Sequence, residues 1–388
     1  MPDRILRAMD RPVIDHRSPE FGQMVKALLP DVAKVFKSEQ GKVVLYPASG
    51  TGAWEASLVN TLAPGDRVLI FNNGHFATLF AETARNLGID VDEVPLRWGQ
   101  GVPAELVEEK LRDDKGGSTA YKAVLVVHNE TSTGVTTRIP AIREAIDRTG
   151  HPALFMVDTI SSLASLDYRH DEWGVDVTVA GSQKGLMLPP GISFNAVSDK
   201  ALAASKHARL PRAYWRWDET IAMNRQGYFP STPATNLLYG LHEAIAMLRE
   251  EGLPAVFARH QRHAEATRRA VRAWGLEILC RSPAEYSGSL TGVMMPEGHD
   301  ADAFRRDVLA RFDMSLGTGL GRLAGRVFRI GHLGFFNDLM LCGTLCGVEM
   351  GLALRDVPHR KDGVGAALAF LQENAAQTTT TTAQRRAA

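Results

Sequence analysis

Short apolar runs alternate with amphipathic stretches between residues 42 and 198, and this pattern constrains the fold more than any other feature. Several of the runs lack polar alternation, as expected of strands that are covered on both faces. Helix-like segments, among them 52–62 and 138–149, lie between them. The pattern predicts right-handed βαβ units and an α/β fold with a mainly parallel sheet. Seven strands are expected, at KVVLYP, RVLIF, VDEVPL, AVLVVHNE, ALFMVD, VDVTVAGS and ISFNAVS.

The chain has 388 residues, which is too long for a single compact core, so a second domain is expected. An N-terminal segment at 1–20 precedes a large domain at 21–250, which ends in a helix near 236–251. A smaller α+β domain follows at 251–370, and the low-complexity end at 371–388 is expected to be a disordered tail. The elements expected in the smaller domain are a helix from residue 253, strands near 276–281 and 290–295, a helix near 300–311, the VFRIGHLG run and a helix at 337–355.

The charge balance and the cysteines narrow the class of protein. Lys plus Arg equals Asp plus Glu at 44 each, which argues against a nucleic-acid or membrane partner. No apolar run approaches the roughly 20 residues of a membrane span, and the charged N-terminus lacks the core of a signal peptide. Three cysteines are too few for a disulfide framework, so we expect a cytoplasmic protein. Cys342 and Cys346 stand four apart in an apolar helix and are expected in the core, and no metal site is expected.

Polar or small residues follow five of the predicted strands: ASGTG, NNGHF, HNETSTG, DTISS and GSQKG. Ligands of open α/β sheets bind at the carboxyl ends of the strands. Because parallel strands present those ends at one edge, the five loops predict a single site.

Three of these loops carry groups with specific chemistry. Ser49 and Thr51 belong to a turn that opens a helix, where backbone N–H groups favour a phosphate. Small residues at such a turn are, however, often present only because the turn conformation favours them. The turn lacks the Gly-Lys-Ser/Thr ending of a nucleotide P-loop. Asp158 ends an apolar strand, so it is either a helix N-cap or a carboxylate in need of a cation. Lys184 follows a later strand, and a lone lysine there often only snorkels to solvent.

Together, the three features match the needs of pyridoxal phosphate. A lysine amine forms a Schiff base with the aldehyde of this cofactor, an aspartate pairs with its pyridine nitrogen, and a helix N-terminus holds its phosphate. The combination therefore favours a cofactor enzyme over the separate structural explanations.

The stretch that contains Asp158 and Lys184 resembles a known family. FMVDTISSLASLDYRHDEWGVDVTVAGSQKGLMLPPG is similar to the class V aminotransferases of pyridoxal phosphate fold type I, and within them to the serine–glyoxylate and alanine–glyoxylate aminotransferase group. Supporting stretches in the family's order are IDHRSPEF, YPASGTGAWEASLVNTLAPGDRV, VVHNETSTGV, GYFPSTP and VFRIGHLG. The resemblance covers nearly the whole chain. It implies a transaminase that moves an amino group from a small L-amino acid to a 2-oxo acid.

The resemblance implies a role for individual residues. Lys184 matches the Schiff-base lysine, and Asp158 matches the partner of the pyridine nitrogen. Arg329 matches the arginine that grips the substrate carboxylate, whereas His332 nearby is expected to be structural. The further residues implied in cofactor binding are Ser49, Gly50 and Thr51 at the phosphate, Gln183 also at the phosphate, Thr131 beside the ring oxygen, Phe76 stacked on the ring, Ile160, and Thr232. Thr232 matches a residue that reaches the neighbouring subunit's phosphate, which implies a homodimer with shared sites.

The sequence departs from the family pattern in two places. Relatives usually have a further N-terminal stretch, including a Pro-Gly-Pro-Thr-like loop over the substrate, so the start at Met1 predicts either a late start or an open pocket. Thr159 stands where close relatives often have glycine, and its side chain is expected beside the ring, narrowing the pocket.

Three functions remain open at this stage. The first is transamination with glyoxylate as acceptor and serine as the favoured donor, with alanine or aspartate as alternatives. The second is a lyase such as a cysteine desulfurase, which needs a thiol that the MSLGTGLG loop lacks. The third is a cofactor-binding protein that no longer catalyses because its N-terminus is short.

Overall fold

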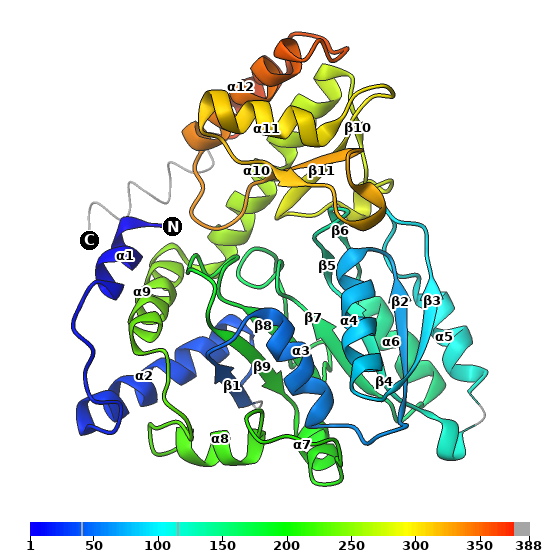
Figure 1. The fold of residues 1–388 in the computed structure, drawn as a ribbon, viewed down its shortest axis with the longest axis vertical. Coiled ribbons are helices and arrows are strands. Elements are labelled where there is room, and N and C mark those ends of the chain that lie inside the picture. The colour runs from blue at the N-terminus through cyan, green and yellow to red at the C-terminus, as the bar shows by residue number, and fades with distance from the viewer. Residues whose placement is uncertain (40–41, 115, 376–388) are drawn as a thin grey trace. The chain divides into compact units, whose positions relative to one another are not determined.

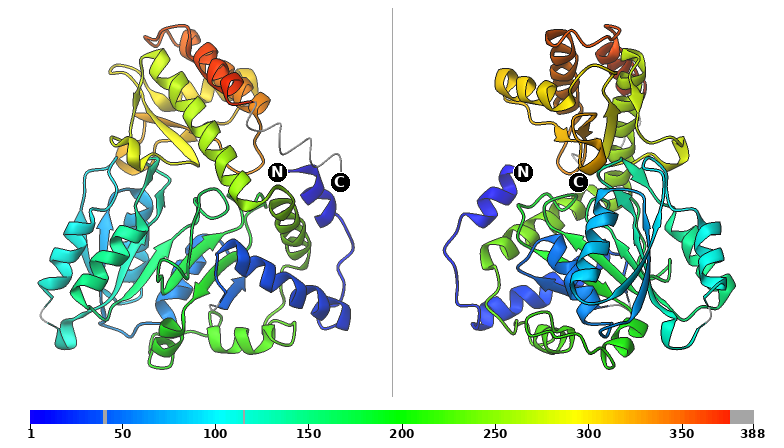
Figure 2. Two further views of the ribbon diagram at one scale, coloured as in Figure 1. Left: turned by 180° about the vertical axis from the view of Figure 1, so that it is seen from behind. Right: turned by 45° about the vertical axis from the view of Figure 1, so that its right-hand side comes forward.

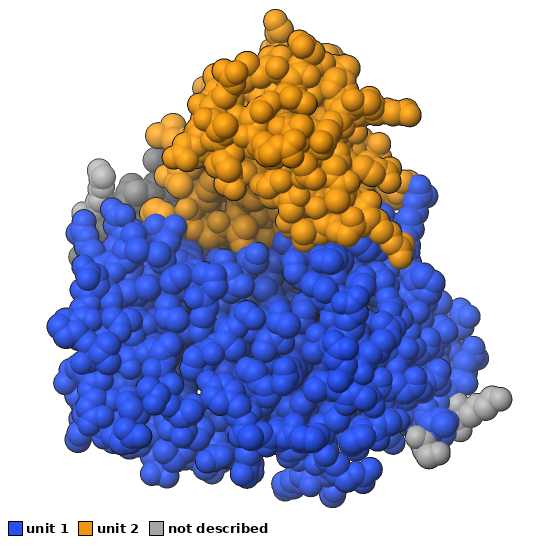
Figure 3. Space-filling view, viewed as in Figure 1, with its two compact units in different colours: residues 1–131, 135–256 blue, residues 132–134, 257–388 orange. Residues whose placement is uncertain are grey.

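The computed structural model describes residues 1–39, 42–114 and 116–375, and the chain divides into two compact units (Figure 3). Unit 1 comprises residues 1–131 and 135–256, and unit 2 comprises residues 132–134 and the chain from 257 onward. The N-terminal segment belongs to unit 1, because Asn236 donates to the carbonyl of Met9 at 2.7 Å.

The central sheet of unit 1 has the strand order β1-β9-β8-β7-β4-β2-β3 (Figure 1). The prediction of a mainly parallel sheet is confirmed: only β9 runs antiparallel to its neighbours, β1 and β8. Each of the seven predicted strands is present, as β1 (Lys42–Tyr46), β2 (Arg67–Asn72), β3 (Asp90–Pro95), β4 (Tyr121–Val127), β7 (Leu154–Asp158), β8 (Val177–Gly181) and β9 (Ser193–Val197). A short hairpin of β5 (Asn129–Glu130) and β6 (Val135–Thr136) follows β4.

Helices cover both faces of this sheet, which explains why its strands are uniformly apolar. Helices α3 and α4 lie in front of the sheet in Figure 1, whereas α5 and α6 come forward in the view from behind (Figure 2). Trp54 of α3 stacks on Phe80 of α4 in the core, with ring centroids 5.2 Å apart. The helices are α1 (Asp3–Met9), α2 (Pro19–Val35), α3 (Gly50–Val59), α4 (His75–Asn86), α5 (Ala104–Arg112), the 3-10 turn η1 (Gly117–Thr119), α6 (Ile139–Thr149), α7 (Asp199–Ser205), α8 (Trp217–Asn224) and α9 (Thr235–Glu251).

Strands β8 and β9 form an antiparallel hairpin, in which Gly181 pairs with Ser193. The connecting loop, residues 182–192, therefore has its two ends on adjacent strands. Two bonds from Ser182 close it further: its N–H donates to the carbonyl of Ile192 at 2.9 Å and its hydroxyl to the carbonyl of Pro189 at 2.8 Å.

Unit 2 has an antiparallel sheet with the order β10-β11-β13-β12, covered by helices, which confirms the predicted α+β class. The strands are β10 (Glu277–Ile278), β11 (Leu290–Met294), β12 (Gly317–Thr318) and β13 (Val327–Gly331). The helical segments are α10 (Leu253–Trp274), which crosses the boundary at residue 257, the 3-10 turns η2 (Pro283–Glu285) and η3 (Gly321–Leu323), α11 (Ala301–Phe312), α12 (Asp338–Leu354) and α13 (Gly363–Glu373). In the described residues, no helix combines the length and the apolarity needed to cross a bilayer.

The expected disordered tail, 371–388, overlaps the end of α13. This helix continues to Glu373, and Leu371 is buried in the core of unit 2, so apolar packing orders the start of that segment. The rest of the expected tail, residues 376–388, lies outside the described residues.

The prediction that Cys342 and Cys346 are core residues is wrong for Cys346, which is exposed, and Cys342 is only partly buried. Both lie on α12, whose sequence is mostly apolar and whose two charged residues, Asp338 and Glu349, bond to other parts of unit 2. The polar residues of this helix therefore do not mark its solvent side. Which side is buried is therefore decided by the neighbouring helices alone.

Candidate active site

The carboxyl ends of β1, β2, β4, β7 and β8 lie at one edge of the sheet, since these strands share a direction. The five loops with polar or small residues follow these strands, so unit 1 brings the sequence-predicted residues of these loops to one edge.

Asp158 is the last residue of β7 and is 3% exposed. Both of its carboxylate oxygens accept hydrogen bonds: Oδ2 from the indole Nε1 of Trp54 at 2.8 Å, and Oδ1 from the backbone N–H of Ile160 at 2.7 Å. The bond from Ile160 has the geometry of an Asx-type turn, whereas the bond from Trp54 fixes the carboxylate from α3. The sequence reading missed Trp54, because an indole in an apolar helix resembles any other core residue.

Burial raises the pKa of the Asp158 carboxyl to about 7, and the negative charge of Glu130 acts in the same direction. The hydrogen bonds from Ile160 and Trp54 and the charge of Lys184 lower that pKa. A buried carboxylate of this kind is stabilised by a cation placed against it. Asp158 is thus suited to hold a positively charged group of a bound molecule.

Lys184 lies on the loop between β8 and β9 and is half-buried. Its carbonyl accepts from the N–H of Met187 at 2.9 Å, in a tight turn where Met187 has a φ of 63°. Gly185 is essential to this turn, because a Cβ there would lie 2.2 Å from the carbonyl oxygen of Leu163. The loop that carries Lys184 is therefore packed directly on the loop that follows Asp158.

The turn at Ser49 opens α3 and supplies donors for an anion. Ser49 is the N-cap residue, and within the described chain its side chain makes no capping hydrogen bond. The first turn of α3 contains no acidic residue, so its backbone N–H groups are not matched by a carboxylate of their own helix. Gly50 packs tightly on Ile160, since a Cβ on Gly50 would lie 2.3 Å from Cδ1 of that side chain. The turn that is expected to bind a phosphate is thus in contact with Ile160, two positions after Asp158.

Gln183 brings an unsatisfied polar atom to the same place. Its Oε1 is buried and has no hydrogen-bond partner among the described residues. A Cβ built on Gly181 would lie 3.0 Å from this atom and 3.7 Å from the backbone nitrogen of Gly50, so the amide lies close to the start of α3. Buried polar atoms in native structures are normally satisfied. An amide oxygen only accepts hydrogen bonds, so a phosphate at the uncapped start of α3 would be bound by the NH2 group of Gln183 after a flip of its side-chain amide. The buried carboxylate of Asp158 fits a cationic ring nitrogen.

Thr131 and Phe76 are held at this edge by neighbouring loops. The hydroxyl of Thr131 donates to that of Ser161 at 2.8 Å, and Ser161 donates to the carbonyl of Asn129 at 2.8 Å. The backbone N–H of Phe76, in the first turn of α4, donates to the buried carboxylate of Glu130 at 3.1 Å. Glu130 thus caps α4 and sets the position of Phe76, a role that the sequence reading did not assign.

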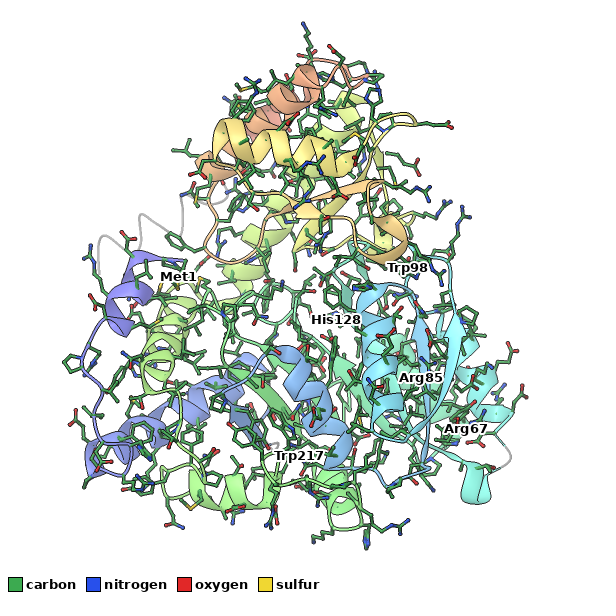
Figure 4. The ribbon with its side chains drawn as sticks, viewed as in Figure 1. Met1, Arg67, Arg85, Trp98, His128 and Trp217 are labelled. Atoms are coloured by element: carbon green, nitrogen blue, oxygen red, sulfur yellow. The ribbon has the colours of Figure 1, made fainter. Side chains whose placement is uncertain are left out.

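His128, labelled in Figure 4, is a second residue that the sequence reading missed. It follows β4 and is buried. Its backbone N–H donates to the carbonyl of Asp158 at 2.9 Å, and Nδ1 of its ring lies 2.9 Å from the hydroxyl of Ser162. Burial lowers its pKa to about 3, so the ring is neutral. Its position directly after a strand, in HNETSTG, was the available signal. We interpret His128 as a structural residue that holds the ends of β4 and β7 together.

Thr159 is bonded to the neighbouring strand, and its expected effect on the width of the pocket stays a prediction. Its side chain is fully buried, and Oγ1 donates to the carbonyl of Val179 on β8 at 2.9 Å, beside a 2.7 Å bond from its own N–H to the same oxygen. The hydroxyl is therefore directed to the neighbouring strand, because the strand end offers it an acceptor.

Two residues of the predicted set lie on other parts of the chain. Thr232 is exposed, between α8 and α9 of unit 1. Arg329 is on β13 of unit 2, where its Nε donates to the carbonyl of Thr318 at 2.8 Å. His332 in the same unit is fully buried, with Nε2 and Nδ1 each 3.1 Å from an oxygen, of Thr291 and Gly288 respectively. This environment agrees with a structural role for His332.

Comparison with known proteins assigns the family. The family described as Aminotransferase class-V matches residues 9–311, and the chain belongs to it. A serine–glyoxylate aminotransferase of Methylorubrum extorquens is 48% identical over 380 residues, which cover 96% of this chain and 94% of the relative. An L-aspartate–glyoxylate aminotransferase of Paracoccus denitrificans is 45% identical over 389 residues, which cover 100% of this chain and 96% of the relative.

A solved structure supports the same conclusion. The ureidoglycine–glyoxylate aminotransferase of Bacillus subtilis matches with a TM-score of 0.87 at 26% identity, over 95% of each chain. The expected fold, type I of the pyridoxal-phosphate-dependent transferases, is thereby confirmed.

Proposed function

We propose that the protein is a pyridoxal-phosphate-dependent aminotransferase that moves the amino group of a small L-amino acid, with L-serine favoured, to glyoxylate, giving glycine and a 2-oxo acid. The observation that carries the proposal is the packing of the Lys184 loop on the loop that follows Asp158, at the ends of adjacent strands. The relatives named for serine–glyoxylate and aspartate–glyoxylate transfer support the substrate classes.

Residues of unit 1 would hold the cofactor. Its phosphate would be bound by Ser49, Gly50 and Thr51 at the start of α3, and by the side-chain amide of Gln183, which would turn its NH2 donor toward the phosphate. The additional contacts proposed are Thr131, Ile160 and Phe76, with the Phe76 ring stacked on the pyridine. Bound pyridoxal phosphate supplies an aldehyde that takes up the amino group and a ring that accepts electrons.

Asp158 and Lys184 have separate tasks. The buried carboxylate of Asp158 holds a proton on the ring nitrogen, because a charge at that depth favours a cationic partner. The amine of Lys184 removes the proton from Cα of the donor and later delivers a proton to Cα of the product. The carboxylate of Asp158 is fixed by Trp54, and the backbone of Lys184 is held by the closed β8–β9 loop.

Arg329 is the proposed carboxylate-binding residue, since a planar guanidinium can grip a carboxylate with two parallel hydrogen bonds. Every amino acid and oxo acid of the reaction carries that group. We further propose a cytoplasmic homodimer, in which Thr232 reaches the cofactor phosphate of the partner subunit. The exposure of Thr232 in the single chain supports that contact.

Visible absorbance of the purified protein tests the proposal. L-Serine should remove the band of the bound cofactor, and glyoxylate should restore it. The same titration with L-aspartate and L-alanine ranks the donors, and aspartate is a specific alternative because of the Paracoccus denitrificans relative. A cofactor band that no amino acid changes would instead support a cofactor-binding protein without transaminase activity. Failure to bind the cofactor at all would refute the roles of Lys184 and Asp158.

A further inference from the structure

Arg329 lies between two glycines in the sheet of unit 2. On β13 it pairs with Gly292 of β11 on one side and with Gly317 of β12 on the other. Directly paired residues of an antiparallel sheet project from the same face. A glycine inside a strand often marks a place where another group approaches the backbone closely. The two glycines therefore leave room for the arginine to lie along the sheet, whereas side chains of strands normally stand upright on it.

The side chain of Arg329 lies over Gly317. A Cβ added to Gly317 would come 2.9 Å from Cβ, 3.1 Å from Nε and 3.4 Å from Cζ of the arginine. Nε of Arg329 also donates to the carbonyl of Thr318, the next residue of β12, at 2.8 Å. On the opposite side, a Cβ on Gly292 would lie 3.3 Å from the carbonyl oxygen of Thr133, so backbone fills that space. The guanidinium is thus held on the β12 side of its strand.

Helix α11 anchors β12 on both sides of Gly317. Nε of Arg305 donates to the carbonyl of Leu316 at 2.8 Å. The hydroxyl of Thr318 donates to Oδ1 of Asp302 at 2.8 Å. This bond is the main cause of a lowered pKa of the Asp302 carboxyl, which is therefore ionised and a strong acceptor. Because both neighbours of Gly317 are fixed, a side chain added at this position must displace the residue beside it on β13.

We propose that Gly317 and Thr318 are positioning residues, which orient the guanidinium of Arg329 for the carboxylate that donor and acceptor share. The inference rests on the proposed function, in which Arg329 binds that carboxylate. With Nε directed to the carbonyl of Thr318, the substrate carboxylate is bound by the two Nη groups in parallel hydrogen bonds. A planar fork binds a carboxylate in one orientation, so a small displacement of the guanidinium costs affinity.

Two oxyamines separate the effect of the carboxylate from every other effect. Aminooxyacetate and O-methylhydroxylamine condense with the aldehyde of bound pyridoxal phosphate through the same group, but only aminooxyacetate carries a carboxylate. In the holoenzyme, we expect Gly317→Ala to lower the second-order rate constant of aminooxyacetate about tenfold, because the arginine is displaced. The rate constant of O-methylhydroxylamine, measured by the same change in absorbance, should stay the same.

The matched control is Gly343→Ala on α12, because a Cβ there would meet no atom of the described residues within 4 Å. It should leave both rate constants unchanged, and thermal melts check that each variant is folded. Equal losses for the two oxyamines in Gly317→Ala would show a general disturbance of the site and would overturn the proposal. An unchanged rate with aminooxyacetate would overturn it as well.

Arg329→Lys in the same assay distinguishes this inference from the proposed function. We expect it to slow aminooxyacetate alone, as Gly317→Ala does. If only Arg329→Lys has this effect, the orientation of the guanidinium does not depend on Gly317, and the inference alone fails. If neither variant has it, Arg329 does not bind the carboxylate, and that part of the proposed function fails too.

Thr318 provides a test that adds no atoms beside the arginine. Thr318→Val keeps the branched shape but removes the hydroxyl that bonds to Asp302, whereas Thr318→Ser keeps the hydroxyl. We expect the valine variant to lower the rate constant of aminooxyacetate several-fold, because β12 loses an anchor. The serine variant should restore most of it. Similar losses in both variants, or no loss in the valine variant, would contradict a role for the bond between Thr318 and Asp302.

Discussion

The indole N–H of Trp54 donates to Oδ2 of Asp158 at 2.8 Å, and both side chains are buried. The bond connects the first turns of α3, which carry the proposed phosphate site, to the end of β7. A change at Trp54 should therefore affect the cofactor without touching it directly.

We expect Trp54→Phe to weaken cofactor binding about tenfold. The variant keeps a ring against Phe80 but removes the donor to Oδ2, and a buried acceptor without its partner costs about 1–3 kcal/mol. Titration of the cofactor-free protein with pyridoxal phosphate, followed by absorbance, measures the affinity. Trp217→Phe is the matched control, because it also removes a buried indole donor, to Asn195 at 3.3 Å, away from Asp158 (Trp217 is labelled in Figure 4). Equal losses in the two variants would contradict a specific role for Trp54.

The cofactor-free protein should lose stability as the pH rises from about 4 to about 7, because of Asp158. Its pKa is raised from 3.8 to about 7 in the folded state, mainly by burial. Below about pH 4 the carboxyl is protonated in both the folded and the unfolded protein, so it does not change the free energy of unfolding. Between about pH 4 and pH 7 only the unfolded chain releases the proton, so the free energy of unfolding falls. Above about pH 7 the loss of stability is complete.

Asp158→Asn should remove this dependence of stability on pH, since the side-chain amide of asparagine does not titrate. Denaturant unfolding of the two cofactor-free proteins at pH 5 and pH 8 measures the effect. The variant should gain stability relative to the unchanged protein at the higher pH, by an amount on the order of a few kcal/mol. A difference between the two proteins that is the same at both pH values would refute the raised pKa.

We expect Lys184→Arg to lower kcat at least about 100-fold, because a guanidinium retains the positive charge but does not release a proton near neutral pH. Lys206→Arg, at an exposed position of unit 1, is the control and should leave kcat unchanged. Borohydride reduction of the unchanged holoenzyme, followed by peptide mass spectrometry, should find the cofactor attached to Lys184. Attachment to another lysine would disprove the assignment.

We expect Arg329→Lys to raise the KM of both serine and glyoxylate about tenfold with a smaller change in kcat. An ammonium keeps the charge but loses the planar fork, and a hydrogen bond to a charged group contributes about 1.5–3 kcal/mol. The exposed Arg326 lies three residues earlier, so Arg326→Lys serves as the control. If Arg326→Lys has the larger effect, Arg329 is not the carboxylate-binding residue.

The sequence was sufficient to predict the strands and the edge at which the candidate residues gather. Uniformly apolar runs indicated buried strands, and their carboxyl ends placed Asp158 and Lys184. The antiparallel direction of β9 was not predictable in the same way, because a buried apolar strand has the same pattern in either direction.

The contacts between elements could not be predicted from local patterns. Trp54 and Glu130 act through groups 104 and 54 positions away in the chain, in a bond to Asp158 and a bond to Phe76. The bond from Thr159 to Val179 could not be predicted either, since side-chain direction at a strand end depends on the neighbouring strand. Cys346 was expected in the core because an apolar helix does not show in its sequence which side is covered.

The hairpin between β8 and β9 has a consequence for how the enzyme distinguishes donors. Because loop 182–192 is anchored at both ends and tied internally by Ser182, the backbone of Lys184 has little conformational entropy left to lose when substrate arrives. The amine is thus presented at a high effective concentration to whichever Cα is placed before it. Discrimination between serine, alanine and aspartate must then arise from the groups that position the substrate, and evolution can change the preferred donor without altering the lysine hairpin.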